Sequence, residues 1–190
     1  MSGVRVMIAE DEALIRLDLA EQLTEAGYQV VAAVADGRAA LAAAAEHSPD
    51  VVLVDIRMPG EDGLSVTRHL SGRGIAVVMV TAHSTPDVIA EASDAGALAY
   101  LVKPVSAADL LAAIEVARAR RAELAGLAAE VARLTGALAA RRTIDLAKAA
   151  LQRTGLSEDE AFRLLRRQAM DARVTMGEVA QRVLDAAQGA

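Results

Sequence analysis

The sequence predicts an α/β protein with a doubly wound, five-stranded parallel sheet, followed by a long coiled-coil-like helix and a small three-helix domain. Short β-branched runs alternate with longer Ala- and Leu-rich stretches over residues 1–117. A stretch without proline runs from Ser106 to about Ala140, and two Ser/Thr-x-x-Glu patterns come after it. We therefore expect a sheet domain at 1–117, a helical coiled-coil linker at 118–141 and a helical domain at 142–190.

The five expected strands are apolar along their whole length. Strands of this kind are buried on both faces, and each is followed by a helical stretch, so the sheet should be parallel with helices on both sides, as in flavodoxin-like proteins. Gly27, Gly96 and the Ser48-Pro49 pair separate the elements. The expected strands are 4–9, 29–34, 51–55, 76–80 and 98–102, and the expected helices are 12–26, 37–47, 62–72, 86–95 and one from 106 onward.

The long helix carries an apolar seam. Its residues are spaced alternately three and four apart, which is the a/d pattern of a coiled coil. A coiled coil between two chains is one interpretation, and it leads us to expect a homodimer, at least of the active protein. An amphipathic helix folded back on its own chain is the other. The seam consists of Leu124, Leu127, Val131, Leu134 and Leu138.

Three short helices are expected in residues 142–190. Gly155 ends the first, whose apolar stripe includes Ala147 and Leu151. Capping boxes, a sequence signature of helix N-termini, open the second and third at Ser157–Glu160 and Thr175–Glu178. Helices this short bury little area, so their stability should depend on the long helix or on a second subunit.

Composition excludes several classes of protein. The chain has no cysteine, so disulfides and thiolate chemistry are excluded. No apolar run approaches the roughly 20 residues of a membrane span, and a signal peptide is not expected, so we expect a cytoplasmic protein with no membrane partner. Of the net charge of −6, residues 1–117 carry 7 basic and 17 acidic side chains, and residues 118–190 carry 13 basic and 9 acidic. This division suggests different partners for the two parts, although an Arg-rich helical surface would give the same charges.

Polar residues stand at the ends of four apolar runs. Glu10-Asp11-Glu12 follow the first, Asp55 ends the third, and Thr81 and Lys103 follow the fourth and fifth. The carboxyl ends of parallel strands meet at the edge of the sheet where ligands bind. Each residue alone could belong to an ordinary turn or helix start, but their common position favours a single site.

The residue types at this site suit phosphoryl transfer. Asp11 and Asp55 could supply oxygen ligands to Mg²⁺, with Glu10 holding a metal-bound water. Asp55 could act as a nucleophile toward a phosphoryl donor. Lys103 would pair with Asp55 at rest, and Thr81 would donate a hydrogen bond to a phosphoryl oxygen.

With Tyr100 and the stretch Val54–Gly63, these motifs resemble the receiver domain of two-component response regulators over about residues 3–117. The resemblance implies that a sensor histidine kinase phosphorylates Asp55. It also implies a switch in which Thr81 moves toward the phosphoryl group and Tyr100 turns inward. The alternative for Tyr100 is a half-buried aromatic at the sheet edge. The Mg²⁺ ligands that it implies are Glu10, Asp11, Asp55 and the backbone carbonyl of Arg57.

The stretches Ala147–Leu151, Gly155–Phe162 and Leu165–Met170 are similar to the ANTAR domain, a small three-helix RNA-binding module of antitermination regulators, over about residues 142–187. Together with the receiver, they resemble actinobacterial receiver–ANTAR regulators. This implies binding of hairpin RNA and control of transcription antitermination. We expect Phe162 in the core, which leaves base stacking a minor role. The basic candidates for RNA contact are Lys148, Arg153, Arg163, Arg166, Arg167 and Arg173.

Two other outputs remain open. A DNA-binding regulator is one, although the terminal segment lacks a tight helix–turn–recognition-helix pairing. A relay whose terminal helices bind a partner protein is the other. An enzymatic output is not expected, because residues 142–190 show no metal cluster, nucleophile–base set or glycine-rich phosphate loop. Beyond accepting a phosphoryl group on Asp55, and possible self-dephosphorylation there, the chain is not expected to be an enzyme.

Overall fold

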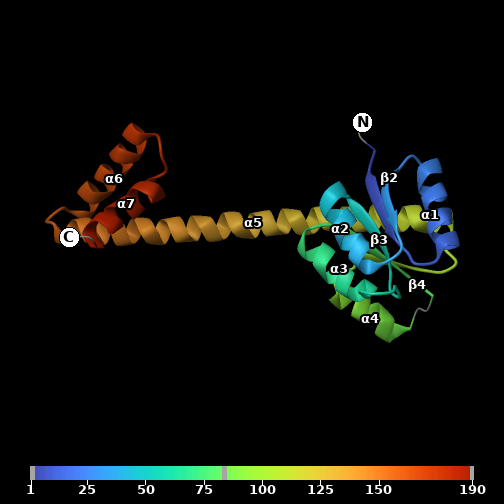
Figure 1. The fold of residues 1–190 in the computed structure, drawn as a ribbon. Coiled ribbons are helices and arrows are strands. Elements are labelled where there is room, and N and C mark those ends of the chain that lie inside the picture. Colours follow the sequence, from blue (N-terminus) through green and yellow to red (C-terminus); the bar gives the residue numbers. More distant parts are fainter. Residues whose placement is uncertain (1–2, 83–84, 189–190) are drawn as a thin grey trace. The chain divides into compact units, whose positions relative to one another are not determined.

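The computed structural model describes residues 3–82 and 85–188, and its N-terminal part is a five-stranded sheet between layers of helices (Figure 1). All neighbouring strands are parallel, in the order β2-β1-β3-β4-β5, which confirms the predicted doubly wound fold. The strands are β1 (Arg5–Ala9), β2 (Gln29–Val34), β3 (Val51–Asp55), β4 (Ala76–Thr81) and β5 (Ala99–Val102). The helices between them are α1 (Ala13–Glu25), α2 (Gly37–His47), α3 (Gly63–Gly72) and α4 (Pro86–Asp94).

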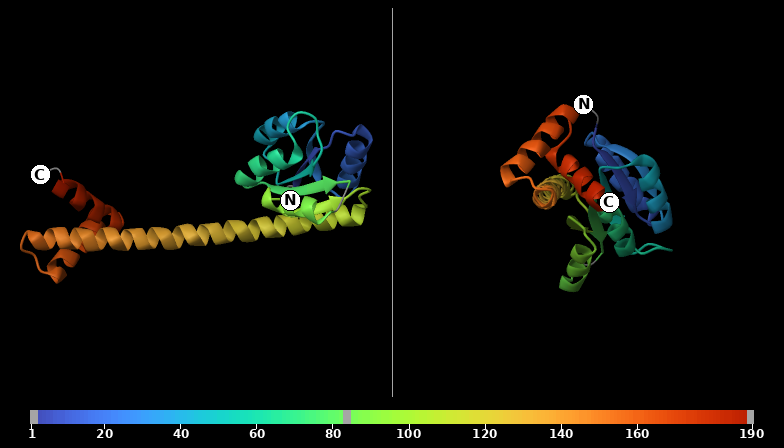
Figure 2. Two further views of the ribbon diagram at one scale, coloured as in Figure 1. Left: turned by 90° about the horizontal axis from the view of Figure 1, so that it is seen from below. Right: turned by 90° about the vertical axis from the view of Figure 1, so that its left-hand side faces the viewer.

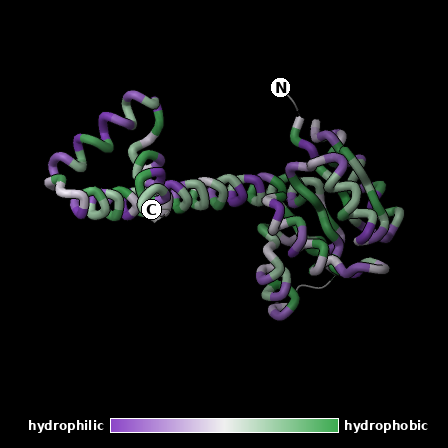
Figure 3. The backbone as a smooth tube through the Cα atoms, turned by 60° about the vertical axis from the view of Figure 1, so that its left-hand side comes forward, coloured by the Kyte–Doolittle hydropathy of each residue, from purple (hydrophilic) through white to green (hydrophobic). Residues whose placement is uncertain are grey.

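Alternate residues of each central strand face opposite helical layers, since the side-chain period of a strand is two. Val6 and Ile8 of β1 pack in a core with α1 and the start of the long helix α5 (Ala107–Arg153), whereas Met7 and Ala9 pack in a second core with α2, α3 and α4. Figure 2 shows helices on both sides of this sheet, and Figure 3 shows the strands as hydrophobic runs. Burial on both faces explains why these strands are apolar throughout.

The strand register aligns the carboxyl ends of the central strands. Ala9 pairs with Val54, Asp55 with Val80, and Thr81 with Val102. The residues at and just after these ends therefore reach one edge of the sheet.

The long helix α5 (Ala107–Arg153) is continuous over 47 residues. A separate helix beginning near residue 142 was expected, but α5 runs through this point because Arg141-Arg142-Thr143 contains neither glycine nor proline. The first helix of the C-terminal module is thus the last part of α5. The chain divides into two compact units, residues 1–126 and 127–190, and α5 contributes to both.

The apolar seam of α5 is exposed in the single chain. Its five side chains are between 48% and 70% exposed. Within each of the two units, no described element covers these side chains, so the coiled coil between two chains stays a prediction.

The C-terminal unit packs α6 (Glu158–Ala172) and α7 (Met176–Gln188) with the end of α5. Ser157 and Glu160 form the predicted capping box at α6, and Thr175 and Glu178 make the same reciprocal hydrogen bonds at α7. Gly155 has a φ of 100°, a conformation that ends α5 at low steric cost. The core of this unit is small and consists of Ala147, Leu165, Ala169, Val179 and Ala180, with partly buried neighbours.

Phe162 does not lie in this core, contrary to expectation. Its neighbours Ala161 and Leu165 are fully buried, whereas Phe162 is 41% exposed. Ala161, Leu165 and Ala169 are four residues apart and form the inward stripe of α6, which leaves Phe162 about 100° away around the helix. In the part of the chain that the structure describes, no helix is long and apolar enough to span a membrane.

Candidate functional site

The carboxyl edge of the sheet brings together acidic side chains from two neighbouring strands. Asp55 is the last residue of β3, and Glu10 and Asp11 follow β1 directly. Each of the three offers one carboxylate oxygen, and these oxygens all lie within 4.8 Å of one another. Glu10 is 1% exposed and Asp55 6% exposed, whereas Asp11 is exposed to solvent. The cluster therefore has two buried carboxylates and one that reaches water.

The oxygens of this cluster fit a hard divalent cation such as Mg²⁺. Oε2 of Glu10 is buried and has no hydrogen-bond partner among the described residues. A buried carboxylate oxygen without a partner is costly, and a water bound to a metal could satisfy it.

Lys103 neutralises the buried carboxylates. Its Nζ lies 2.8 Å from Oε1 of Glu10 and 3.0 Å from Oδ2 of Asp55. The side chain of Lys103 is 11% exposed, so these are shielded, charge-assisted hydrogen bonds. The exposed carboxylate of Glu12 lies farther off, at 3.6 Å from Nζ.

The pKa values of this cluster are shifted by burial and by pairing. Burial raises the pKa of Glu10 above its ordinary value and the charge of Asp55 raises it further, while the hydrogen bond from Lys103 opposes both. Burial alone would lower the pKa of Lys103, but its hydrogen bonds to Glu10 and Asp55 outweigh burial and raise it overall. The carboxylates of Glu10 and Asp55 therefore keep Lys103 protonated at neutral pH.

The two oxygens of Asp55 differ in their surroundings. Oδ2 accepts the short hydrogen bond from Lys103, whereas from the described residues Oδ1 accepts only a long one, at 3.4 Å, from the backbone N–H of Arg57. Gly63 begins α3 so close to this strand end that a Cβ there would lie 2.0 Å from the backbone oxygen of Asp55. Only a glycine allows this approach of α3 to the site.

Arg16 of α1 also belongs to the site and was not predicted. Its Nη1 donates to the backbone carbonyls of Glu10, at 2.6 Å, and of Asp11, at 3.2 Å. These bonds hold the turn that carries both carboxylates. The sequence offers no signal for this role, because an arginine in the second turn of a helix is ordinary.

The other predicted site residues lie farther out or on neighbouring elements. Thr81 ends β4 and is 6% exposed, beside the strand of Asp55. Tyr100 in the edge strand β5 is 46% exposed, so its ring is half in solvent. Arg57 is exposed in the loop after β3 and contacts Asp55 through its backbone N–H.

The basic residues proposed for RNA contact fall into two groups. Lys148 is held by Glu158 at 2.9 Å and by Asp145 at 3.3 Å, and these partners raise its pKa. The backbone carbonyl of Asp159 accepts a hydrogen bond from Nε of Arg163 at 3.2 Å. The remaining four side chains are exposed and have no ion pair or hydrogen bond within the described ranges: Arg153, Arg166, Arg167 and Arg173.

Comparison with known proteins also finds two domains in the chain. The family model of the response regulator receiver domain matches residues 6–115, and that of the ANTAR domain matches residues 132–184. The transcriptional regulatory protein PdtaR of Mycobacterium tuberculosis is 47% identical over 95% of this chain and 89% of its own length. The positive alginate biosynthesis regulatory protein of Pseudomonas aeruginosa is 41% identical over 65% of this chain and 51% of its own.

Among solved structures, the signal receiver domain of the response regulator NarL from Mycobacterium tuberculosis is similar to the N-terminal unit. The TM-score is 0.59 at 32% identity, and the match covers 62% of this chain and 98% of that domain. The similarity to PdtaR thus extends over both units, whereas the similarity to the NarL receiver domain extends over the sheet domain.

Proposed function

Because the chain belongs to the two-component response regulators that join a receiver domain to an ANTAR domain, we propose that phosphorylation of Asp55 controls binding of hairpin RNA by the C-terminal unit. The observation that carries the proposal is the buried cluster of Glu10, Asp55 and Lys103 in the same chain as an ANTAR match. Such a protein controls transcription antitermination. It acts in the cytoplasm, where it meets both a sensor histidine kinase and nascent RNA.

The receiver accepts the phosphoryl group on Asp55. Oδ1, the less strongly bonded oxygen, attacks the phosphorus of the kinase phosphohistidine. The O–P bond forms as the N–P bond breaks, and the electron pair of that bond returns to the imidazole. Glu10, Asp11, Asp55 and the Arg57 carbonyl would hold Mg²⁺, which when bound offsets the charge of the phosphoryl oxygens.

Two residues then respond to the new charge. Lys103 donates to a phosphoryl oxygen in place of Oδ2 of Asp55, which loosens its bond to that carboxylate. Thr81, at the end of the neighbouring strand, donates its hydroxyl to another phosphoryl oxygen. Tyr100 turns inward from its half-exposed position as Thr81 moves.

The output is RNA binding by the C-terminal unit. Exposed arginines that lack protein partners can donate to phosphates, and single-stranded hairpin loops present readable base edges. Phe162 is exposed on the same helix as Arg166 and Arg167, so base stacking can contribute more than its expected core position would allow.

Two copies of the chain would associate through the exposed seam of α5. A dimer covers the apolar a/d side chains and presents two ANTAR modules to two hairpins, and linkage raises the effective affinity of two weak sites.

A hairpin-RNA binding assay tests the proposal. Full-length protein is treated with Mg²⁺ and acetyl phosphate, and its affinity for RNA with paired hairpins is compared with that of Asp55→Asn under the same treatment. We expect phosphorylation to tighten binding by about tenfold or more in the wild type, as coupling energies of this type allow, and to leave Asp55→Asn unchanged. Asp18→Asn on the exposed face of α1 is the control and should behave as wild type.

Three outcomes would contradict parts of the proposal. An equal RNA affinity of the wild type and Asp55→Asn, each with and without acetyl phosphate, would contradict the phosphorylation switch. A preference for duplex DNA would favour the DNA-binding alternative. Absence of nucleic-acid binding would favour a relay to a protein partner.

A further inference from the structure

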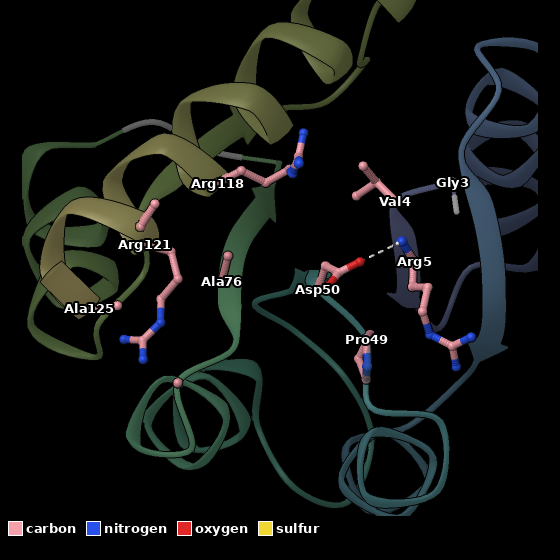
Figure 4. Close-up of a pocket in the computed structure, with 11 residues that line it drawn as sticks. Gly3, Val4, Arg5, Pro49, Asp50, Ala76, Arg118, Arg121 and Ala125 are labelled. Carbon is pink, nitrogen blue, oxygen red and sulfur yellow. Dashed lines mark hydrogen bonds between the residues drawn. The ribbon is translucent and has the colours of Figure 1, made fainter. Parts of the chain in front are cut away.

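A hollow of about 580 Å³ lies at the amino-terminal edge of the sheet, at the opposite ends of the strands from Asp55 (Figure 4). The starts of β1 and β4, the turn before β3 and residues 118–125 of α5 line it. The size is in the range of small-molecule sites, roughly 300–1,000 Å³. All of these residues belong to the N-terminal unit.

Arg121 supplies an available positive charge to this hollow. Its guanidinium lies over Gly74, where a Cβ would come within 2.4 Å of Nη2. Gly74 has a φ of +81°, so its backbone conformation suits glycine. Arg121 makes no hydrogen bond or ion pair within the described parts of the chain, which leaves its donors free for a ligand.

Arg118 is the second cation, and it is held in place. Its Nη1 lies 2.8 Å and 2.9 Å from the two carboxylate oxygens of Glu115. The hydroxyl of Tyr28 donates to the same carboxylate at 2.8 Å. This chain of contacts positions the guanidinium at the rim, and its other nitrogens have no partner among the described residues.

The rest of the hollow is apolar apart from one carboxylate. Val4, Pro49 and Ala76 provide apolar surface from the sheet side, and Ala122 provides it from α5. Oδ2 of Asp50 accepts the backbone N–H of Arg5 at 2.8 Å, and Oδ1 has no partner in the described structure (Figure 4). The guanidinium of Arg5 itself is bonded to the backbone carbonyl of His47.

The electrostatic setting makes this place distinct within its unit. The helices α1 to α4 end near this edge, so their dipoles present negative ends here and disfavour an anion unless cations are supplied. Residues 1–117 are strongly acidic, with 17 acidic against 7 basic side chains. An anion is therefore repelled from most of this unit, and the α5 arginines provide the exception.

We propose that this hollow binds an organic phosphate of nucleotide size. Arg121 and Arg118 donate to the phosphate oxygens, the free oxygen of Asp50 accepts from a hydroxyl or amino group, and the small apolar surfaces cover a flat ring. A bound ligand would connect the sheet to the segment of α5 that leads into its exposed seam.

AMP binding to the full-length protein tests this proposal, with amide NMR shifts as the readout. We expect saturable shifts at Arg5, Asp50 and Gly74, and weaker binding of adenosine and of inorganic phosphate, each lacking one half of the ligand. Arg121→Gln should weaken AMP binding about tenfold, as loss of a charge-assisted hydrogen bond implies, and Arg121→Lys should weaken it less. Asp50→Asn should weaken it too.

Arg120→Gln is the matched control. Arg120 is the neighbour of Arg121 in α5, but its Nη1 donates to the backbone oxygen of Leu98 at 2.9 Å and it does not line this hollow. We expect its AMP affinity to equal that of the wild type. Equal losses in the two variants, or no saturable shifts with AMP, would overturn the proposal. Loss of binding in Asp55→Asn would also overturn it, because the ligand would then occupy the phosphorylation site.

Discussion

Lys103 is the residue on which the resting state of the receiver site depends. One ammonium group contacts two carboxylates that are almost completely removed from solvent. Two buried negative charges at this distance repel each other, and an ion pair in low dielectric is strong only when its partners are all present. We therefore expect Lys103 to support the fold of the receiver as well as its chemistry.

We expect Lys103→Met to lower the free energy of unfolding of the receiver by about 3 kcal/mol at neutral pH, as for other buried pairs that lose one partner. The pKa of Glu10 is already raised in the folded state, so the folded protein binds a proton at a higher pH than the unfolded chain does. The stability that this proton contributes is lost as the pH rises through the folded-state pKa. Without Lys103 the pKa of Glu10 rises further, so the deficit should be smaller at pH 5 than at pH 8.

Tyrosine fluorescence during urea unfolding measures this effect. The chain has no tryptophan, and both tyrosines, Tyr28 and Tyr100, lie in the N-terminal unit, so the signal reports that unit alone. Lys103→Arg keeps the charge and is the control. A deficit of the same size at both pH values would contradict the assignment to Glu10.

The basic side chains of the C-terminal unit should also differ in their contribution to RNA binding. Arg166 and Arg167 have no protein partner, whereas Lys148 is paired with Asp145 and Glu158. We expect Arg166→Gln with Arg167→Gln to weaken RNA binding and to reduce the salt dependence by roughly 0.7 per lost phosphate contact. Lys148→Gln should change the salt dependence less. The measurement is the slope of log affinity against log salt concentration for the wild type, the double arginine variant and Lys148→Gln. Equal slopes in the two variants would contradict the prediction.

At the scale of single elements, α6 and α7 begin with the same device. In each, a glutamate accepts from the hydroxyl and backbone N–H of the N-cap residue and keeps a lowered pKa. The small core of this unit leaves a larger share of its stability to such helix caps. Helix α5, in contrast, contains no proline and continues past its expected end, although Gly126 and Gly136 lie within it.

The capping boxes predict an acid sensitivity of the C-terminal unit. The hydrogen bond from the Ser157 hydroxyl lowers the pKa of Glu160 most, followed by that from the Ser157 backbone. A lowered folded-state pKa contributes stability above the ordinary pKa of 4.5, and this is lost as the pH falls through the folded value. We expect Glu160→Gln to lower the helical melting temperature at pH 7 and to match the wild type at pH 3, by far-ultraviolet circular dichroism.

Asp171→Asn is the control for this prediction. Asp171 lies near the end of α6 and makes no hydrogen bond in the described residues. Its neutralisation should not lower the melting temperature at pH 7. A deficit in Glu160→Gln that persists at pH 3 would show that the box acts by packing rather than by charge.

At the scale of the whole molecule, the exposed seam of α5 determines the expected assembly. A row of apolar side chains that are 48% to 70% exposed is stabilised when a second copy covers it. The receiver would then regulate RNA binding by changing how readily two chains associate, in addition to any change within one chain.

We expect Val131→Lys to weaken self-association of the phosphorylated protein by about a hundredfold, because it places a charge in the middle of the seam. Ala129→Lys places the same charge on the opposite face of α5 and should leave association unchanged. Sedimentation equilibrium measures both. If the wild type is monomeric with and without phosphorylation and RNA, the dimer proposal fails.

The sequence alone was sufficient for the sheet, its two helical layers and the strand ends that carry Glu10, Asp55, Thr81 and Lys103. It was sufficient because apolar periodicity reports burial directly, and because parallel strands must align their carboxyl ends. Both capping boxes were equally readable, since each depends on residues three apart.

Only the tertiary structure decided which partners the side chains meet. The double contact of Lys103, the bonds of Arg16 to the turn after β1, the exposure of Phe162 and the arginine-lined hollow all depend on side-chain direction and on residues distant in the chain. Short-range patterns report which residues are buried, but they do not report the direction and neighbours of a side chain, because those are set by packing between elements.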